Sequence, residues 1–471
     1  MNKNIFGRKG SAVIFLCIIL SAVILTEGVL YYAARLRGSE ADLARCMRLQ
    51  ISQILCSYNR PLLEKYGLYG LDESSVNTRV FNACFSGKED FELTAKPYSL
   101  ITTEDLRMGI TDYMQIRMPA IASKEILSRF RGVFSEIRES SVFKKAKTLE
   151  SSPWLGYVKN FLGQKEKWSN VISSVLSAAE AIDISGKLSE LEEFSSLIQQ
   201  ELTRNTTLYL QGESAADISD SILNPDNLSK IMSCADSYMN FELPDIADAL
   251  MINEYAAASF DSKIEYIMDG DAKEPEANFL GVPFSDIHGD NRADLEYILT
   301  GMDNELASFN TAKILIYDMR IIVNLGSYLV DSEKMKKAKE IAEILSTGIS
   351  LVSAGTVTID PEALQFIVLY VWALGQGFAD LVKLTGGESI VLFDHSALAG
   401  NMMLEDALLT DYRDYLGLFL LTVPVDWKLS RILTLLKKDC GGELYKGVSL
   451  SADYRGSSFM MEDIYDAYAA K

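Results

Sequence analysis

The stretch Ser11–Leu30, SAVIFLCIILSAVILTEGVL, decides the fold, because nearly all of its residues are apolar or small and Glu27 is its only charge. As a helix it would be about 30 Å long, which matches the hydrocarbon thickness of a lipid bilayer. The sequence therefore predicts a transmembrane helix at residues 11–30.

Charges on either side of this stretch indicate its orientation. The preceding residues include Lys3, Arg8 and Lys9, whereas the following ones mix basic with acidic residues: Arg35, Arg37, Glu40 and Asp42. Because basic residues favour the cytoplasmic side, residues 1–10 are expected to be a cytoplasmic tail and everything after Leu30 to be extracytoplasmic. A cleaved secretory signal is the alternative, but Tyr31–Arg35 lacks the small-residue cleavage pattern. We expect a single-pass protein of the cell membrane.

Glu27 lies one turn from the outer end of the predicted span, and two interpretations stay open. Its carboxylate can reach the lipid headgroups as a tolerated interfacial charge, or it can pair with a cation on the helix of a partner subunit. Lateral helix packing in lipid relies on small residues. The stretch provides such residues at Ser11, Ala12, Ser21, Ala22 and Gly28.

The predicted helix continues beyond the membrane. Apolar residues recur at helical spacing at Leu36, Leu43, Met47, Ile51, Ile54 and Tyr58. The pattern ends at Asn59-Arg60-Pro61, because the residue before a proline is disfavoured in a helix. Residues 31–60 are therefore predicted to extend the transmembrane helix and to pack through one apolar stripe.

The rest of the chain is predicted to be mainly α, with a small antiparallel β-sheet (α+β). Phe91–Ala95, Val448–Ala452 and Ser389–Phe393 have the patterns of strands. Helical spacing occurs at Thr103–Met118, Ser123–Arg138, Asn170–Arg204, Ala293–Leu329, Lys334–Ser353, Pro361–Leu384 and Met403–Lys438. We expect residues 61–125 and 385–471 to form a membrane-proximal α+β part and residues 126–384 a helical part.

Two further apolar stretches, Phe366–Ala379 and Leu416–Val425, are shorter than the roughly 20 residues that a spanning helix needs. Both are predicted to be core helices of the exported part.

Charge and cysteine content exclude some classes of protein. The 471 residues include 65 acidic and 45 basic ones, a net charge of −20, which disfavours nucleic acid as a partner. The exported cysteines, Cys46, Cys56, Cys84, Cys234 and Cys440, have irregular spacing and are expected to be scattered thiols. Cys46 and Cys56 would lie about 15 Å apart on one helix, too far for a bridge. One bridge to Cys84 or Cys440 stays open.

Motifs for catalysis, cofactors or metals do not meet their requirements. His288 and His395 lack zinc-binding partners. Asp286–Asp290 with Glu296 offers oxygen ligands but not the order of a calcium loop, so an acidic solvated turn is favoured. Ser141-Val142-Phe143-Lys144 matches SxxK without its companion motifs. Gly375-Gln376-Gly377 lies inside an apolar helix and is interpreted as a close-packing site. We expect no enzyme activity, cofactor, metal or small-molecule substrate.

A resemblance to a known protein family indicates the cellular system to which this predicted membrane protein belongs. The segment from Gly7 to Asp72 resembles the start of uncharacterised proteins encoded in Gram-positive clusters for tight-adherence (Tad, Flp-type) pili. Further blocks of likeness are Glu92–Pro119, Leu295–Gly301, Ala373–Phe393 and Tyr412–Leu421.

The resemblance implies a TadE/TadG-like, membrane-anchored pseudopilin or assembly factor, whose N-terminal helix contacts other pilus or pseudopilin subunits. Gly10-Ser11 fits the glycine that prepilin peptidases recognise before an apolar helix, but Phe15 stands at the fifth position after the glycine, where prepilins carry glutamate. A single-pass envelope binding or sensor domain is the alternative, and a wall-acting serine enzyme is a third.

Overall fold

The computed structural model describes residues 6–85, 91–117, 170, 173–174, 192, 195–196, 243–264, 292–352, 360–391, 409–421, 423–454 and 456–468. The protein is mainly helical, with a small three-stranded antiparallel sheet, and has the predicted α+β class. It divides into two compact units, residues 1–109 with 436–471 and residues 110–435. The expected boundaries were 125/126 and 384/385, so the structure assigns more of the C-terminal segment to the helical unit.

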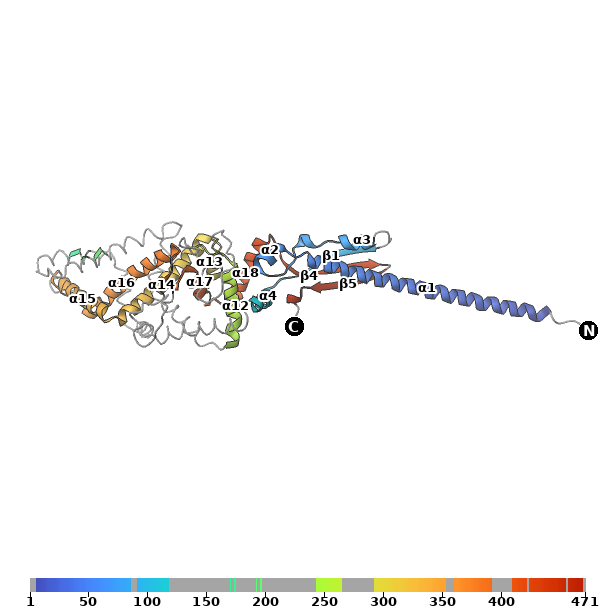
Figure 1. The fold of residues 1–471 in the computed structure, drawn as a ribbon, viewed down its shortest axis with the longest axis horizontal. Helices are drawn as coiled ribbons and strands as arrows, with labels where there is room; N and C mark the ends of the chain where they lie inside the picture. The colour runs from blue at the N-terminus through green and yellow to red at the C-terminus, as the bar shows by residue number, and fades with distance from the viewer. Residues whose placement is uncertain are drawn as a thin grey trace, which may run out of the picture. The chain divides into compact units, whose positions relative to one another are not determined.

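The first unit is built on one long helix, α1 (Phe6–Cys56). It continues through the predicted membrane boundary without interruption (Figure 1). Its stripe Leu43, Met47, Ile51 and Ile54 is at most 2% exposed, as the apolar spacing predicted. The break at Asn59 is also confirmed, because its side chain caps α2 (Arg60–Tyr66) by accepting a hydrogen bond from the Leu62 N–H.

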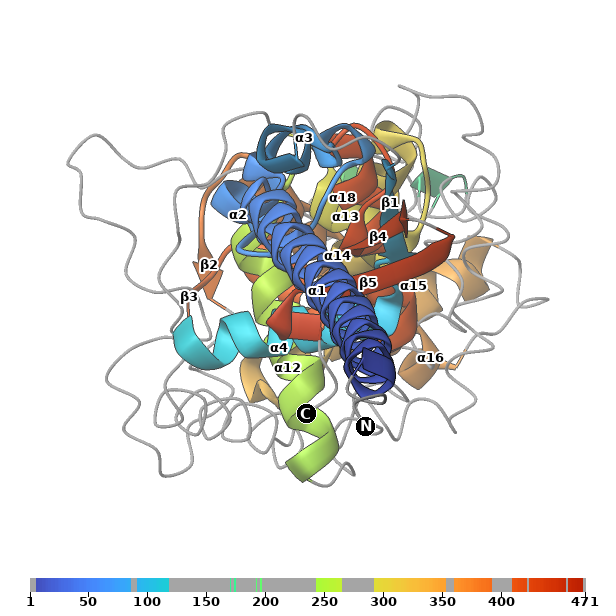
Figure 2. The same cartoon turned by 90° about the vertical axis from the view of Figure 1, so that its right-hand side faces the viewer.

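The stripe of α1 packs against a sheet that joins the two ends of the chain. Its strands are β1 (Phe91–Leu100), β4 (Tyr445–Tyr454) and β5 (Ser457–Ile464), in the order β1-β4-β5, all antiparallel. The two strands predicted at Phe91–Ala95 and Val448–Ala452 are thus confirmed. Both are longer than predicted, and they pair with each other. Figure 2 shows α1 passing over β4 and β5.

Each strand alternates between the two faces of this sheet. Val448, Leu450 and Ala452 of β4 face the α1 stripe, together with Phe459 and Met461 of β5. The intervening residues Ser449, Ser451, Met460 and Glu462 are left on the opposite face. We call this second surface the open face of the sheet.

Several smaller elements complete the first unit. They are η1 (Glu73–Ser75), α3 (Arg79–Phe85), the start of α4 (Thr103–Arg117), the end of α18 (Val425–Asp439) and η3 (Asp466–Tyr468). Asp105 accepts a hydrogen bond from Lys446 Nζ at 2.8 Å, and Asp439 forms an ion pair with Lys65 at 3.3 Å. These contacts link segments more than 300 residues apart in the sequence.

The described part of the second unit is a helical array: α12 (Leu243–Ser259), α13 (Asp294–Thr300), α14 (Glu305–Val330), α15 (Ser332–Val352), α16 (Pro361–Thr385), α17 (Tyr412–Leu420) and most of α18. Helices α14, α15 and α16 lie side by side (Figure 1). Along α16, residues such as Leu364, Val368 and Leu384 are at most 1% exposed, so Phe366–Ala379 belongs to a core helix.

Several sequence predictions need correction in the second unit. Ala293–Leu329 is two helices, because Gly301 ends α13 at φ 75°.

Met403–Lys438 is not one helix: β3 (Leu409–Thr410) precedes α17, and Pro424 separates α17 from α18. Leu416–Val425 is likewise a helix end and a turn rather than one core helix, although Leu416 and Leu420 are buried. Within the third predicted strand, which is described as far as residue 391, Ile390–Val391 form β2, and β2 pairs with β3 in a separate sheet. The predicted helix Ser123–Arg138 and nearly all of Asn170–Arg204 lie outside the described residues.

Candidate functional site

The first candidate surface is the N-terminal half of α1. Every described side chain from Val13 to Arg35 is exposed. Large apolar side chains are among them, such as Leu25, which is 69% exposed, and Tyr31, which is 72% exposed. Apolar surface of this extent is stable in lipid rather than in water. The segment has a mean hydropathy of 2.6 in its most apolar window, and α1 is a candidate membrane span.

Among the described residues, α16 also meets the length and hydropathy test for a span, but 56% of its apolar window is buried inside the protein. The burial of α16 is that of a core helix. α1 is therefore the span that the packing favours.

Glu27 lies on the exposed part of α1, within the predicted membrane segment. The ring pair Tyr31 and Tyr32 follows it, in the position where aromatic residues mark a membrane interface. Gly28 presents open surface, since no other atom would lie within 4 Å of an added Cβ. Gly10 and Ser11 also lie on α1, but their side chains are outside the described part.

The second candidate surface lies further along α1, on the side opposite the buried stripe. An open groove of about 370 Å³ is lined by Ala41, Ala44, Arg45, Arg48, Leu49 and Ser52. Arg45 and Arg48 are exposed, and Leu49 is 48% exposed. The lining combines small side chains with two guanidinium groups, which can pair with carboxylates of another protein surface. We call it the α1 groove.

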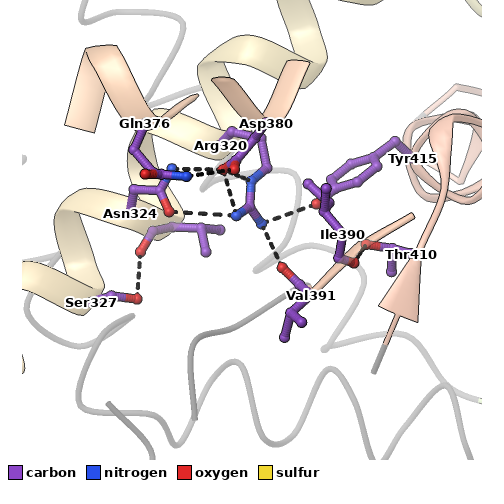
Figure 3. A network of polar contacts seen from close by, with 10 residues as sticks. Arg320, Asn324, Ser327, Gln376, Asp380, Ile390, Val391, Thr410 and Tyr415 are labelled. Atoms are coloured by element: carbon purple, nitrogen blue, oxygen red, sulfur yellow. Dashed lines mark hydrogen bonds and ion pairs between the residues drawn. The ribbon is translucent and has the colours of Figure 1, made fainter. Parts of the chain in front are cut away.

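The third candidate is a buried polar network in the second unit (Figure 3). Arg320 of α14 forms an ion pair with Asp380 of α16 at 2.7 Å between Nη2 and Oδ2. The Arg320 guanidinium also donates to Tyr415 Oη at 3.1 Å and to the Val391 carbonyl at 3.3 Å. Because these donors already have protein partners, the group acts as a crosslink between α14, α16, α17 and β2.

Asp380 is equally occupied by other groups. Its carboxylate accepts hydrogen bonds from Asn324 Nδ2 at 3.0 Å and from Gln376 Nε2 at 2.9 Å, besides the bonds from Arg320. A catalytic carboxylate needs a free oxygen that reaches a substrate. The network therefore has the features of a structural core rather than of an active site.

Other buried ionisable groups of the second unit include Lys428 and Asp318. Lys428 of α18 is fully buried and donates to Asn253 Oδ1. Burial lowers the pKa of Lys428 to about 7. Asp318 of α14 is 7% exposed, and burial raises the pKa of its carboxyl well above the usual range.

The sequence-predicted metal and catalytic candidates do not converge in the described residues. Glu296 is buried and accepts hydrogen bonds from the Lys263 N–H at 2.9 Å and Tyr412 Oη at 3.0 Å, and burial raises the pKa of Glu296. Over the described ranges, no three His, Cys, Asp or Glu side chains form a cluster suited to a metal ion. The other members of these motifs lie outside the described residues: Ser141, Lys144, Asp286–Asp290, His288 and His395.

The remaining sequence candidates have structural roles. Gly377 is a close-packing site, as interpreted, because an added Cβ would lie 3.2 Å from Ile321 Cγ1. Cys17, Cys56 and Cys440 are free thiols, whereas the side chains of Cys84 and Cys234 are not among those described.

Sequence reasoning missed the α1 groove, Lys428 and the pairing of Arg320 with Asp380. The groove had a signal: Ala41, Ala44, Arg45, Arg48 and Ser52 share the helix face that the apolar stripe leaves free. The Arg320–Asp380 pair had none, since the two residues are 60 positions apart on separate helices.

These features define a helix-rich α+β protein with a long apolar N-terminal helix that is a candidate membrane span. Comparison with family models places residues 186–451 in a family of unknown function, DUF5702. The match covers more than half of the chain, and the chain belongs to this family. It leaves α1 and β5 outside the matched region. No curated protein and no solved structure matches the chain.

Proposed function

We propose that this chain is a non-enzymatic, membrane-anchored pseudopilin-like or assembly component of a Tad/Flp-type pilus or a related envelope secretion machine. Residues 1–10 would be cytoplasmic, and the bulk of the chain would lie on the outer side of the cell membrane. The proposal joins the family resemblance of the sequence to the geometry of α1.

One observation carries the proposal: α1 is a single uninterrupted helix with two different environments. Its first half is exposed and apolar, whereas Leu43, Met47, Ile51 and Ile54 are buried against an antiparallel sheet. A flexible linker would let the domain move independently of its anchor. A continuous helix instead ties the anchor rigidly to the domain, as is expected of a subunit that assembles through its membrane helix.

The lack of a flexible tether also separates this proposal from a binding or sensor domain. Such a domain needs an anchor only to stay at the membrane, so the residue sequence of its span matters little. A pseudopilin-like subunit needs particular small residues on its span, such as Ser21, Ala22 and Gly28, because helices in lipid associate by close packing.

The test is gene deletion followed by complementation, with surface filaments counted by electron microscopy. Deletion is expected to abolish or strongly reduce filaments, and the intact gene to restore them. A matched variant in which residues 11–30 are replaced by an unrelated transmembrane helix of equal length is expected to insert but not to restore filaments. Normal filaments in the deletion strain would overturn the proposal. Full restoration by the exchanged helix would instead favour the tethered binding domain.

A further inference from the structure

The α1 groove lies beyond the reach of lipid headgroups. Counting from Tyr32, Arg45 is about 20 Å and Arg48 about 24 Å further along the helix. The headgroup layer on each side of a bilayer is only about 5–8 Å thick. Arg35 and Arg37 fall within that layer, whereas the groove projects past it. An acidic protein surface is therefore the better partner for Arg45 and Arg48.

No ion pair joins Arg45 or Arg48 to another residue of the described ranges, and both side chains are exposed. A complementary acidic side chain is available on other copies of the same chain, because Glu462 is exposed on the open face of the sheet.

On that open face, Met460 is 68% exposed and Glu462 is exposed on the edge strand β5. Successive side chains of a strand point to opposite faces of the sheet, and Phe459 and Met461 face the α1 stripe of the same copy. Met460 and Glu462 therefore point away from their own α1. They offer an apolar and an acidic group to a neighbour, which match Leu49 and Arg48 of the groove.

The two surfaces also lie at the same height above the membrane. Tyr465 Oη donates a hydrogen bond to the Leu55 carbonyl at 2.8 Å, which aligns β5 with α1. From Leu55 back to Arg48 is about 10 Å of helix, and from Tyr465 back to Glu462 is about 10 Å of strand. In two copies anchored in one membrane with the same orientation, Glu462 of one copy thus stands level with Arg48 of the other.

We propose that the α1 groove of one copy docks on the open face of β5 of a second copy, with Arg45 and Arg48 against Glu462 and Leu49 against Met460. The contact joins two different surfaces, so it is head-to-tail and continues from copy to copy rather than closing as a dimer. The inference rests on the proposed membrane anchoring, but not on the identity of the filament system.

Disulfide crosslinking of the full chain in membranes tests this contact. In a background with Cys17→Ser, Cys56→Ser and Cys440→Ser, cells co-express one copy with Arg48→Cys and another with Glu462→Cys. Mild oxidation is expected to give a mixed dimer only when both are present, and a ladder of multimers when both changes are in one chain. Ser458→Cys is the matched control, because it lies on the same face about 13 Å from Glu462 along β5. Absence of the mixed dimer, or equal crosslinking by Ser458→Cys, would overturn the inference.

Charge exchange gives a second readout that separates copies from other partners. Arg45→Glu with Arg48→Glu is expected to lower self-association of the full chain in detergent by about fivefold or more, since like charges then meet. Adding Glu462→Arg is expected to restore it. Failure of this rescue, or capture of a different protein or of anionic lipid by the unchanged groove, would contradict the contact between copies.

The filament assay keeps the two proposals distinct. Crosslinking between copies together with normal filaments after gene deletion would remove the pilus role and leave the contact. Loss of filaments without crosslinking would leave the pilus role and remove the contact between copies.

Discussion

Arg320 and Asp380 show how single residues hold the helical unit together. Both side chains are only 6% exposed, and their ion pair is completed by hydrogen bonds from Asn324 and Gln376. A buried charge is tolerated when every donor and acceptor is satisfied, and it becomes costly when its partner is removed. The pair therefore fixes how α14 and α16 sit against each other.

Asp380→Ala is expected to destabilise the protein by about 3–5 kcal/mol, because it leaves the Arg320 guanidinium buried without a counter-charge. Chemical denaturation followed by circular dichroism measures the change. The double variant Arg320→Met with Asp380→Leu is the control, since it removes both charges together, and it is expected to be clearly more stable than Asp380→Ala. Equal stability of the two variants would contradict a satisfied ion pair.

Lys428 gives the helical unit a pH dependence. Its pKa is about 7 in the folded protein and near 10.5 when unfolded, so the unfolded chain binds more protons between these values. Stability from this group therefore rises as pH increases from about 7 towards 10, by at most about 4 kcal/mol. Lys428→Met is expected to lose this rise. Denaturation curves at pH 7 and pH 9.5 measure it, and parallel pH profiles of the two proteins would refute the buried, uncharged lysine.

Glu27 is the charge within the predicted span that the sequence left with two interpretations. If its carboxylate pairs with a partner subunit, Glu27→Gln leaves membrane insertion unchanged but lowers co-purification with partners several-fold. Quantitative pull-down from solubilised membranes measures this. Glu40→Gln, which lies outside the span, is the matched control. Unchanged co-purification would favour the tolerated interfacial charge.

At the scale of elements, the sequence predicted the helices and strands whose patterns depend on neighbouring residues alone. The course of α1, its apolar stripe and the stop at Asn59-Arg60-Pro61 follow from helical spacing and from the restriction before proline. β1 and β4 follow from strict alternation. The break at Gly301 was missed although it has a local signal, since a glycine is the usual residue at the left-handed position that ends a helix. The strand at Leu409–Thr410 had no such signal, because it depends on pairing with Ile390–Val391.

The candidate surfaces divide in the same way. The exposed apolar half of α1 and Glu27 were predicted because a span is read from composition and length alone. The α1 groove was missed because it requires knowing which face of the helix the sheet covers. Its residues share the face that the predicted stripe of Met47 and Ile51 leaves free, but the sequence does not show that this face stays uncovered in the folded unit.

Gly447 fixes the pairing of β4 with β5. An added Cβ would meet the Asp463 carbonyl oxygen and would lie 2.7 Å from Ile464 Cγ2. Gly447→Ala is expected to destabilise the edge strand by about 1–3 kcal/mol and to speed proteolysis of the C-terminal segment. Gly442→Ala, where an added Cβ has no other atom within 4 Å, is expected to be close to neutral. Equal behaviour of both variants would contradict the close approach of β5.

At the scale of the whole molecule, the N-terminal and C-terminal segments belong to one unit and a long internal segment forms the other. The sheet of β1, β4 and β5 therefore forms only after the C-terminal segment has been made, while α1 is available from the start. This order suits the proposed membrane anchoring, because the N-terminal helix could insert before the domain that packs on it has folded.

The proposed function requires that both units lie on the outer side of the membrane. The direct measurement is protease digestion of intact protoplasts that express the chain with an epitope tag on its N-terminus, detected by immunoblotting. We predict that protease removes nearly all of the mass and leaves a tagged fragment of about 30–35 residues, the length of the cytoplasmic tail plus the span. Detergent-lysed protoplasts, in which the tag is also lost, are the control. Survival of the full-length chain in intact protoplasts would contradict the account.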